Sequence, residues 1–273
     1  MLSKREQNYK TKKKYGQNFL ENKEILNEIF SFVELGAKDT VIEIGPGLGF
    51  LTETLSEKAE KVYSFEIDTD LVKILDKKFS DRKNLELIHS DFMEYDLSEI
   101  LSDKKDVKVV ANIPYYITSP IINKLIGFSE NISEIYVMVQ KEVAQRISAV
   151  SPSKEVSILT HSVQFFGEAK YLFTVKKEHF NPAPKVDSAF LAIKLYKDKR
   201  YENQISEKEY FKYLKAAFSN KRKSLGNNMN SIGYEKQEVI RALEGVGKSS
   251  LARAEEFSVQ EFIDLINFLK RGA

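Results

Sequence analysis

Short apolar runs alternate with amphipathic stretches between residues 40 and 139, and this pattern leaves few folds open to the chain. The apolar runs are rich in β-branched and aromatic residues, as strands are, and they span residues 40–45, 61–67, 85–91, 107–112 and 134–139. The amphipathic stretches predict helices at residues 50–59, 69–79 and 119–128. Because strands that alternate with helices pair in parallel, we predict an α/β fold whose parallel sheet has helices on both faces.

The pattern changes after residue 197. A charged linker, KDKRYENQ, is followed by three stretches with helical periodicity, at residues 209–218, 237–246 and 259–269. We therefore predict an α/β domain of residues 1–197 with a basic N-terminal tail, and a smaller all-helical domain of residues 198–273.

Composition excludes several classes of protein and site. The chain has no Cys, which rules out disulfides, thiol nucleophiles and thiolate zinc sites. The histidines are scattered without metal-ligand spacing, so we expect no metal site. No apolar run approaches the roughly 20 residues of a membrane span, and no apolar segment follows the basic start. We expect a soluble cytoplasmic protein that does not bind membranes.

The cations are clustered although the net charge is only +2. One cluster occupies residues 1–14 and sets a single acid, Glu6, against Lys4, Arg5, Lys10, Lys12, Lys13 and Lys14. The other is Lys221, Arg222 and Lys223. Such clusters are typical of surfaces that bind a phosphate backbone, because each cation releases a condensed counterion. Either cluster by itself is also compatible with a solvated surface.

Polar groups follow successive predicted strands. Gly45, Gly47 and Gly49 form a glycine-rich turn after the first strand, where a ligand can approach the backbone. Glu66, about twenty residues later, is placed to accept the two hydroxyls of a ribose. Asp91, followed by an aromatic ring, suits the amine and ring of adenine. Because open α/β sheets bind ligands at the carboxyl ends of their strands, we predict a nucleoside-binding cofactor site.

The fourth strand ends in the tetrad Asn112, Ile113, Pro114 and Tyr115. The Asn112 side-chain carbonyl and the Ile113 backbone carbonyl offer two acceptors to an exocyclic aromatic amine, which would free its lone pair for attack. Pro114 fixes the backbone, and Tyr115 offers a face on which a base can stack. The electrophile would be a methyl group on a sulfonium, transferred mainly by positioning. The alternative reading makes Asn112 a turn former and Tyr115 a core residue.

Seven motifs, in order from about residue 10 to the C terminus, resemble the small-subunit (16S) rRNA adenine dimethyltransferase family of the kasugamycin-resistance type. They are YGQNFL (15–20), VIEIGPGLGFLT (41–52), FEID (65–68), SDFMEYD (90–96), NIPYYITSP (112–120), HFNPAPKVDSAF (179–190) and AFSNKRKSLGNN (217–228). The resemblance implies a Rossmann-like methyltransferase sheet, S-adenosyl-L-methionine as cofactor, and dimethylation of two adjacent adenosines near the 3′ end of 16S rRNA in the 30S subunit.

The resemblance also implies roles for individual residues. The positions that match the family's cofactor site are Asn18, Leu20, Gly45, Glu66, Asp91 and Asn112. Tyr115 and Phe180 match the two rings that hold the target adenine. Beside a base-modifying site, Lys221, Arg222 and Lys223 are expected to hold the rRNA backbone. We expect a monomer.

Two positions depart from the family's usual pattern, and other functions stay open. Tyr116 stands where many relatives have Asn, and the basic run is Asn-Lys-Arg-Lys where relatives often have two arginines before the lysine. The nearest alternative is a macrolide-resistance methyltransferase acting on large-subunit (23S) rRNA, which shares the tetrad. A non-catalytic ribosome assembly factor is the alternative from another class, and a DNA adenine methyltransferase is less compatible with the C-terminal motifs.

Overall fold

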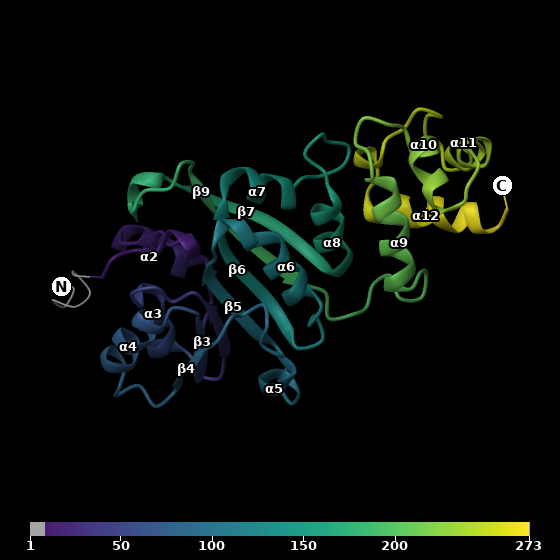
Figure 1. Cartoon of the computed structure of the whole chain (residues 1–273). Coiled ribbons are helices and arrows are strands. Elements are labelled where there is room, and N and C mark those ends of the chain that lie inside the picture. Colours follow the sequence, from purple (N-terminus) through teal and green to yellow (C-terminus); the bar gives the residue numbers. More distant parts are fainter. Residues whose placement is uncertain (1–8, 273) are drawn as a thin grey trace. The chain divides into compact units, whose positions relative to one another are not determined.

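A computed structural model describes residues 9–272 of the chain. By contacts between residues, the chain divides into two compact units (Figure 1). The first comprises Met1–Ala144 and Ala169–Lys197, and the second comprises Gln145–Glu168 and Asp198–Ala273. The second unit thus includes a segment that precedes the charged linker in the sequence.

The first unit is built on a seven-stranded sheet with the strand order β4-β3-β2-β5-β6-β9-β7. Its strands are β2 (Thr40–Ile44), β3 (Lys61–Glu66), β4 (Leu85–His89), β5 (Val107–Asn112), β6 (Ile132–Gln140), β7 (Gly167–Val175) and β9 (Ser188–Leu195). Strands β2 to β6 pair in parallel, and they are the five strands that the apolar runs predict. The predicted α/β class is confirmed.

The parallel sheet predicted from the five apolar runs continues on one side into β9 and β7, which the sequence analysis does not predict. Strand β9 pairs with β6 in antiparallel register, with Ser188 opposite Gln140 and Lys194 opposite Glu134. Strand β9 has no crossover helix before it, because residues 176–187 connect it to β7. The alternation of strand and helix that indicates parallel pairing therefore stops at β7.

Helices cover both faces of this sheet. The helices of the first part of the chain are α2 (Lys23–Phe32), α3 (Phe50–Lys58), α4 (Thr69–Lys78), α5 (Ser98–Leu101), α6 (Thr118–Ile126) and α7 (Lys141–Ile147). The predicted helices correspond to α3, α4 and α6, with ends displaced by one or two residues. Successive strand residues point to opposite faces, and Val41, Ile42, Glu43 and Ile44 of β2 are all buried. Both faces of β2 are therefore shielded from water.

A small second sheet joins the N-terminal segment to a distant loop. Strand β1 (Phe19–Leu20) pairs in antiparallel register with β8 (Phe180–Asn181), with Leu20 opposite Phe180. This pairing brings the QNFL and FNPAPKV motifs together.

The second unit is helical. Its helices are α8 (Ile158–Phe166), α9 (Glu207–Ala217), α10 (Leu225–Asn228), α11 (Lys236–Gly245) and α12 (Val259–Lys270). The three predicted helical stretches correspond to α9, α11 and α12. Tyr210, Phe257 and Phe262 are fully buried in its core. Phe165 of α8 stacks on Tyr210 with ring centroids 4.4 Å apart, which explains why α8 belongs to this unit.

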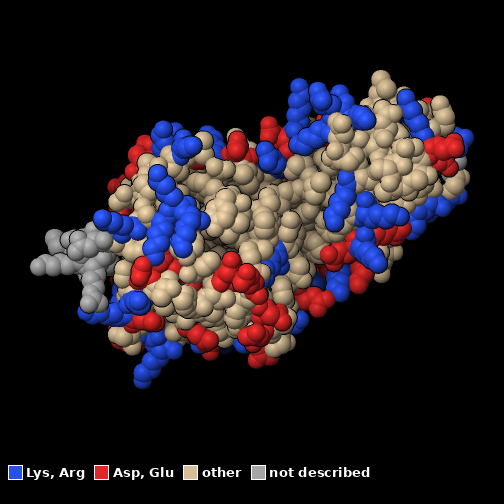
Figure 2. Space-filling model, in the orientation of Figure 1, with Lys and Arg blue, Asp and Glu red and all other residues tan. Residues whose placement is uncertain are grey.

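Acidic and basic side chains are interspersed on the face shown in Figure 2. Within residues 9–272, no helix is long and apolar enough to cross a membrane. The same residues contain no group of three or more His, Asp or Glu side chains arranged to hold a metal ion.

Candidate active site

The site lies where the strand order reverses, between β2 and β5. The chain proceeds from β2 outward through β3 and β4, and then crosses back to β5 on the other side of β2. Gly45 follows β2 with a left-handed φ of 69°, and a Cβ there would lie 3.8 Å from the backbone oxygen of Asn112. Crevices at such reversal points are the usual ligand sites of open α/β sheets.

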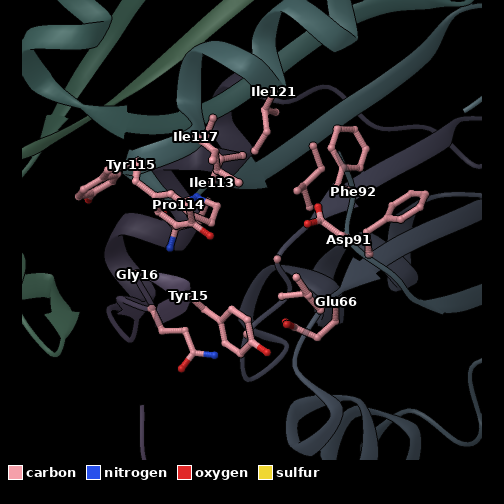
Figure 3. A pocket seen from close by; sticks show the side chains of 18 of the residues that line it. Tyr15, Gly16, Glu66, Asp91, Phe92, Ile113, Pro114, Tyr115, Ile117 and Ile121 are labelled. Atoms are coloured by element: carbon pink, nitrogen blue, oxygen red, sulfur yellow. The ribbon is translucent and has the colours of Figure 1, made fainter. Parts of the chain in front are cut away.

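A cavity opens at this point and is lined from several strand ends. Its walls include the predicted residues Asn18, Gly45, Gly47, Glu66, Asp91, Asn112, Ile113, Pro114 and Tyr115. In Figure 3, Glu66 and Asp91 lie on one side of the cavity, and Ile113, Pro114 and Tyr115 lie on the opposite side. The fold therefore gathers most of the predicted cofactor residues and the whole tetrad around one space.

Glu66 is a buried carboxyl at the end of β3. It accepts a hydrogen bond from the backbone N–H of Asp68 at 2.8 Å. Only 4% of Glu66 is exposed, and this burial raises its pKa to about 7. A carboxyl in this position accepts hydrogen bonds from ligand hydroxyls best in its ionised form.

Asp91 and Phe92 form the next part of the wall. One carboxylate oxygen of Asp91 accepts the backbone N–H of Met93 at 2.8 Å, which fixes the side chain in a turn after β4. Phe92 is buried and packs edge-on against Phe65 with ring centroids 5.2 Å apart. The turn thus presents an acceptor beside a fixed aromatic ring.

Asn112 is held by the N-terminal segment. Its side-chain Nδ2 donates to the backbone oxygen of Asn18 at 3.0 Å. Only the nitrogen of an amide can donate to a carbonyl, so this bond fixes the orientation of the side chain and makes Oδ1 its acceptor. At the other end of the tetrad, the Tyr115 hydroxyl hydrogen-bonds the hydroxyl of Ser188, which is fully buried.

Residues 9–18, which we call the strap, cross this region and are hydrogen-bonded to Asp68. The buried carboxylate of Asp68 accepts hydrogen bonds from Tyr9 Oη at 2.6 Å, Lys12 Nζ at 2.6 Å and Gln17 Nε2 at 3.2 Å. Burial alone would raise the pKa of Asp68, but the hydrogen bonds from Lys12 and Tyr9 outweigh it and lower the pKa to about 2. Asp68 is therefore ionised at neutral pH and holds the strap against the cavity.

Three of the predicted cofactor-binding and catalytic residues do not line this cavity. Leu20 lines a neighbouring cavity that also touches Gly45, Gly47 and Asn112. Gly49 precedes α3 with a φ of 80°, and a Cβ there would lie 2.5 Å from the ring of Phe79, so this glycine serves close packing. Phe180 is 4% exposed and belongs to a hydrophobic core cluster.

The two basic clusters lie in different surroundings. In the N-terminal cluster, Lys4 and Arg5 lie outside the described residues, and Lys12 forms ion pairs with Asp68 and Asp70, at 2.6 Å each. The cluster Lys221, Arg222 and Lys223 is exposed in the second unit, in the turn between α9 and α10. Asn228 secures this turn by donating to the backbone oxygens of Ala217 and Asn220 at 2.6 and 3.0 Å.

Sequence reasoning gave no role to three residues that organise the site: Asp68, Lys124 and Ser188. Asp68 and Ser188 stand inside the quoted FEID and PKVDS motifs, two residues after Glu66 and eight after Phe180. Position within a motif is the only sequence signal for these two. Lys124 is an ordinary helical lysine in the sequence, and nothing there distinguishes it.

The chain matches the family described as ribosomal RNA adenine dimethylase over residues 8–271. This chain belongs to that family. The family predicted from the motifs is therefore confirmed.

One named relative and two solved structures support this assignment to the family. The chain is 52% identical over 263 residues to the ribosomal RNA small subunit methyltransferase A of Fusobacterium nucleatum subsp. nucleatum, covering 96% of this chain and 98% of the relative. It resembles the crystal structure of a dimethyladenosine transferase from Plasmodium falciparum with a TM-score of 0.78 and 27% identity, over 92% of this chain and 97% of that one. The structure of the 23S rRNA methyltransferase ErmE matches with a TM-score of 0.71 and 26% identity, over 93% of this chain and 100% of that one. The methyltransferase fold is thus shared along nearly the whole length.

Proposed function

We propose that this member of the family uses S-adenosyl-L-methionine to dimethylate the exocyclic amines of two adjacent adenosines near the 3′ end of 16S rRNA, in the 30S subunit. The observation that carries the proposal is the fixed amide of Asn112, whose Oδ1 is an acceptor at the cavity between the glycine turn and Tyr115. The name of the 52% identical relative supports the small subunit as the substrate.

The residues of the cavity fit an adenosine-bearing cofactor. Glu66 would accept the ribose hydroxyls, while Asp91 and Phe92 would face the adenine amine and ring. Gly45 and Gly47 let the ligand approach the backbone, and Asn18 closes the site from the strap. When bound, S-adenosyl-L-methionine supplies an electrophilic methyl group on its sulfonium sulfur. Leu20 and Gly49 are the two residues of the predicted cofactor-binding set that do not line this cavity.

The tetrad would prepare the acceptor amine. Asn112 Oδ1 and the backbone oxygen of Ile113 are proposed to accept the two N–H groups and to stabilise the positive charge that develops on nitrogen. Pro114 has no N–H to compete, and its φ of −61° holds the carbonyl of Ile113 in place. The displaced proton leaves to water after transfer, so no general base is required.

Tyr115 is proposed as the platform on which the target base stacks. Flipping an adenosine out of its stack costs a few kcal/mol, and stacking on an aromatic ring offsets a similar amount. Phe180, the second proposed ring, is buried, so its contact with the base requires its side chain to become more exposed.

The second unit is proposed to bind rRNA. It holds the predicted helical domain of residues 198–273, and its exposed run Lys221, Arg222 and Lys223 would contact the backbone phosphates. We propose that the chain acts as a monomer in the cytoplasm, where its ribosomal substrate is assembled.

The decisive experiment is methyl transfer from labelled S-adenosyl-L-methionine to undermethylated 30S particles, with 50S particles and DNA as controls, followed by mapping of the modified nucleotides. Dimethyladenosine at two adjacent positions near the 3′ end supports the proposal. Transfer to 50S particles alone would instead indicate the large-subunit activity. Binding to 30S particles without transfer would indicate an assembly factor.

Substitution of Asn112 by Ala tests the assigned chemistry within the same assay. The variant is expected to lose about 10²-fold or more in turnover, since one preorganised acceptor is removed, while it still binds 30S particles. Turnover equal to that of the wild type would contradict the role of Asn112.

A further inference from the structure

One lysine outside the cavity holds the turn that carries Asp91 and Phe92. Lys124 of α6 donates from Nζ to the backbone oxygens of Phe92 at 2.6 Å, Met93 at 3.1 Å and Tyr95 at 2.5 Å. An ammonium has three N–H donors, so these three carbonyls use all of them. Such convergence on one short segment is uncommon for a helical lysine, whose head usually remains in water.

The segment that Lys124 holds is residues 91–96, here called the 91–96 turn. Its own hydrogen bonds fold it tightly, because the backbone N–H groups of Glu94 and Tyr95 both donate to the backbone oxygen of Asp91 at 3.1 Å. The turn leaves three neighbouring carbonyls directed to one side, and Lys124 satisfies them together. Without that donor, partly buried carbonyls would lose their partner, which is costly.

Packing links these hydrogen bonds of Lys124 to the wall of the cavity. The Nζ of Lys124 lies 5.1 Å from the centroid of the Phe92 ring, in addition to its bond with the Phe92 carbonyl. Phe92 in turn packs edge-on against Phe65, and Asp91 and Phe92 both line the cavity. Partial burial lowers the pKa of Lys124, while Asp91 and Asp96 attract its charge.

We propose that Lys124 is a positioning residue for the cofactor, which fixes the Asp91 carboxylate and the Phe92 ring in the geometry that receives the adenine. This role builds on the proposed function, because it assumes an adenine-bearing cofactor in the cavity. Lys124 contacts the turn and not the reacting atoms. Its loss should therefore weaken cofactor binding and leave the methyl-transfer step and rRNA binding intact.

The test compares Lys124→Met with the wild type and with Lys105→Met. Methionine keeps an unbranched apolar side chain but has no donor for the carbonyls. Lys105 is a matched control, since its Nζ donates to a single exposed carbonyl, that of Glu130, at 3.1 Å. The dissociation constant of S-adenosylhomocysteine is measured by calorimetry. The KM for S-adenosyl-L-methionine and the kcat at saturation are measured on 30S particles.

For Lys124→Met we expect a dissociation constant and KM about tenfold higher, with kcat at saturation within about twofold of the wild type. Lys105→Met should bind as the wild type does. Hydrogen exchange of a peptide that covers the 91–96 turn should accelerate in Lys124→Met, since the turn loses its anchor.

Two outcomes would overturn the proposal in different ways. Unchanged S-adenosylhomocysteine affinity in folded Lys124→Met, or a fall in kcat alone, contradicts the role of Lys124 and leaves the proposed function standing. Failure of the wild-type chain to bind S-adenosylhomocysteine contradicts the proposed function, and the role of Lys124 with it. If Lys124→Met does not fold, Lys124→Gln carries the test, because its amide can serve part of the carbonyl set and should give an intermediate affinity.

Discussion

The hydroxyl of Tyr115 is hydrogen-bonded to the hydroxyl of Ser188, a fully buried residue at the start of β9. Residues 73 positions apart thus fix the ring on which the target base is proposed to stack. The bond ties the ring that follows β5 to the antiparallel strand that the sequence pattern does not predict.

Tyr115→Phe and Ser188→Ala remove the same bond from its two ends. Each is expected to lower kcat/KM for 30S particles by about three- to tenfold, and the double variant should be no worse than either single variant. Tyr136→Phe is the matched control, because it removes a hydroxyl bonded to Glu134 at 3.1 Å, outside the cavity. Fully additive losses in steady-state kinetics would show that the two hydroxyls act separately.

The hydrogen bonds between Asp68 and the strap should support cofactor binding. Asp68→Asn removes the charge that holds Tyr9 and Lys12, so the strap residues that line the cavity should loosen. We expect S-adenosylhomocysteine to bind about tenfold more weakly, as measured by calorimetry. Asp70→Asn is the control, since Asp70 bonds the same lysine from an exposed position. Equal affinities for the wild type and Asp68→Asn would contradict this role of Asp68 in cofactor binding.

Cofactor affinity should depend on pH through Glu66, whose pKa burial raises to about 7. Ribose hydroxyls donate to a carboxylate, so the ligand selects the ionised form and lowers the pKa of Glu66 on binding. The dissociation constant of S-adenosylhomocysteine should therefore rise as the pH falls below 7, by up to about tenfold per pH unit. Glu66→Gln should bind more weakly at pH 8 with a flatter profile. A wild-type profile that is flat between pH 5.5 and 8.5 would contradict this role.

His161 should make the helical unit sensitive to acid. It is buried among Phe218, Phe262 and Tyr210, whose hydroxyl lies 2.8 Å from its Nδ1, and burial lowers its pKa from 6.5 to about 4. Between these two values the unfolded chain binds a proton that the folded chain does not. This contribution to stability is fully present above pH 6.5, and it is lost as the pH falls toward 4, to a total of about 3 kcal/mol.

Urea unfolding followed by circular dichroism checks this prediction, because the chain has no Trp to report by fluorescence. His161→Gln should be less stable than the wild type at pH 7.5 and should lose less stability between pH 7.5 and pH 5. Parallel losses in the two proteins would mean that other groups cause the acid sensitivity.

The exposed run Lys221, Arg222 and Lys223 should account for part of the salt dependence of 30S binding. Replacing all three by Ala should weaken binding and reduce the slope of log affinity against log salt by about 2, since three phosphate contacts are lost. The charge-matched control replaces Lys208, Lys212 and Lys215, which are exposed on α9. A slope that changes equally in both triple variants would assign the effect to net charge and not to this run.

The sequence determined the features of this protein that are local. The alternation of strand and helix predicts β2 to β6 and the helices α3, α4 and α6, and the residues that end β3 and β5, Glu66 and Asn112, are already in place at the strand tips. Because parallel strands end at one edge of the sheet, motifs separated in sequence are predicted to meet there. The order of the motifs suffices to name the family.

Only the tertiary structure decided which side chains hold that edge together. Tyr9 reaches Asp68 across 59 positions, and Lys124 reaches the carbonyls of the 91–96 turn across about 30. The same holds for α8, which joins the second unit because Phe165 stacks on Tyr210, and for Phe180, whose ring is buried in the core. A pattern of residue types indicates the propensity of a segment for helix or strand and the face of that element on which each residue lies. The partners of a buried polar group or ring depend on how distant segments pack, and no local pattern specifies that packing.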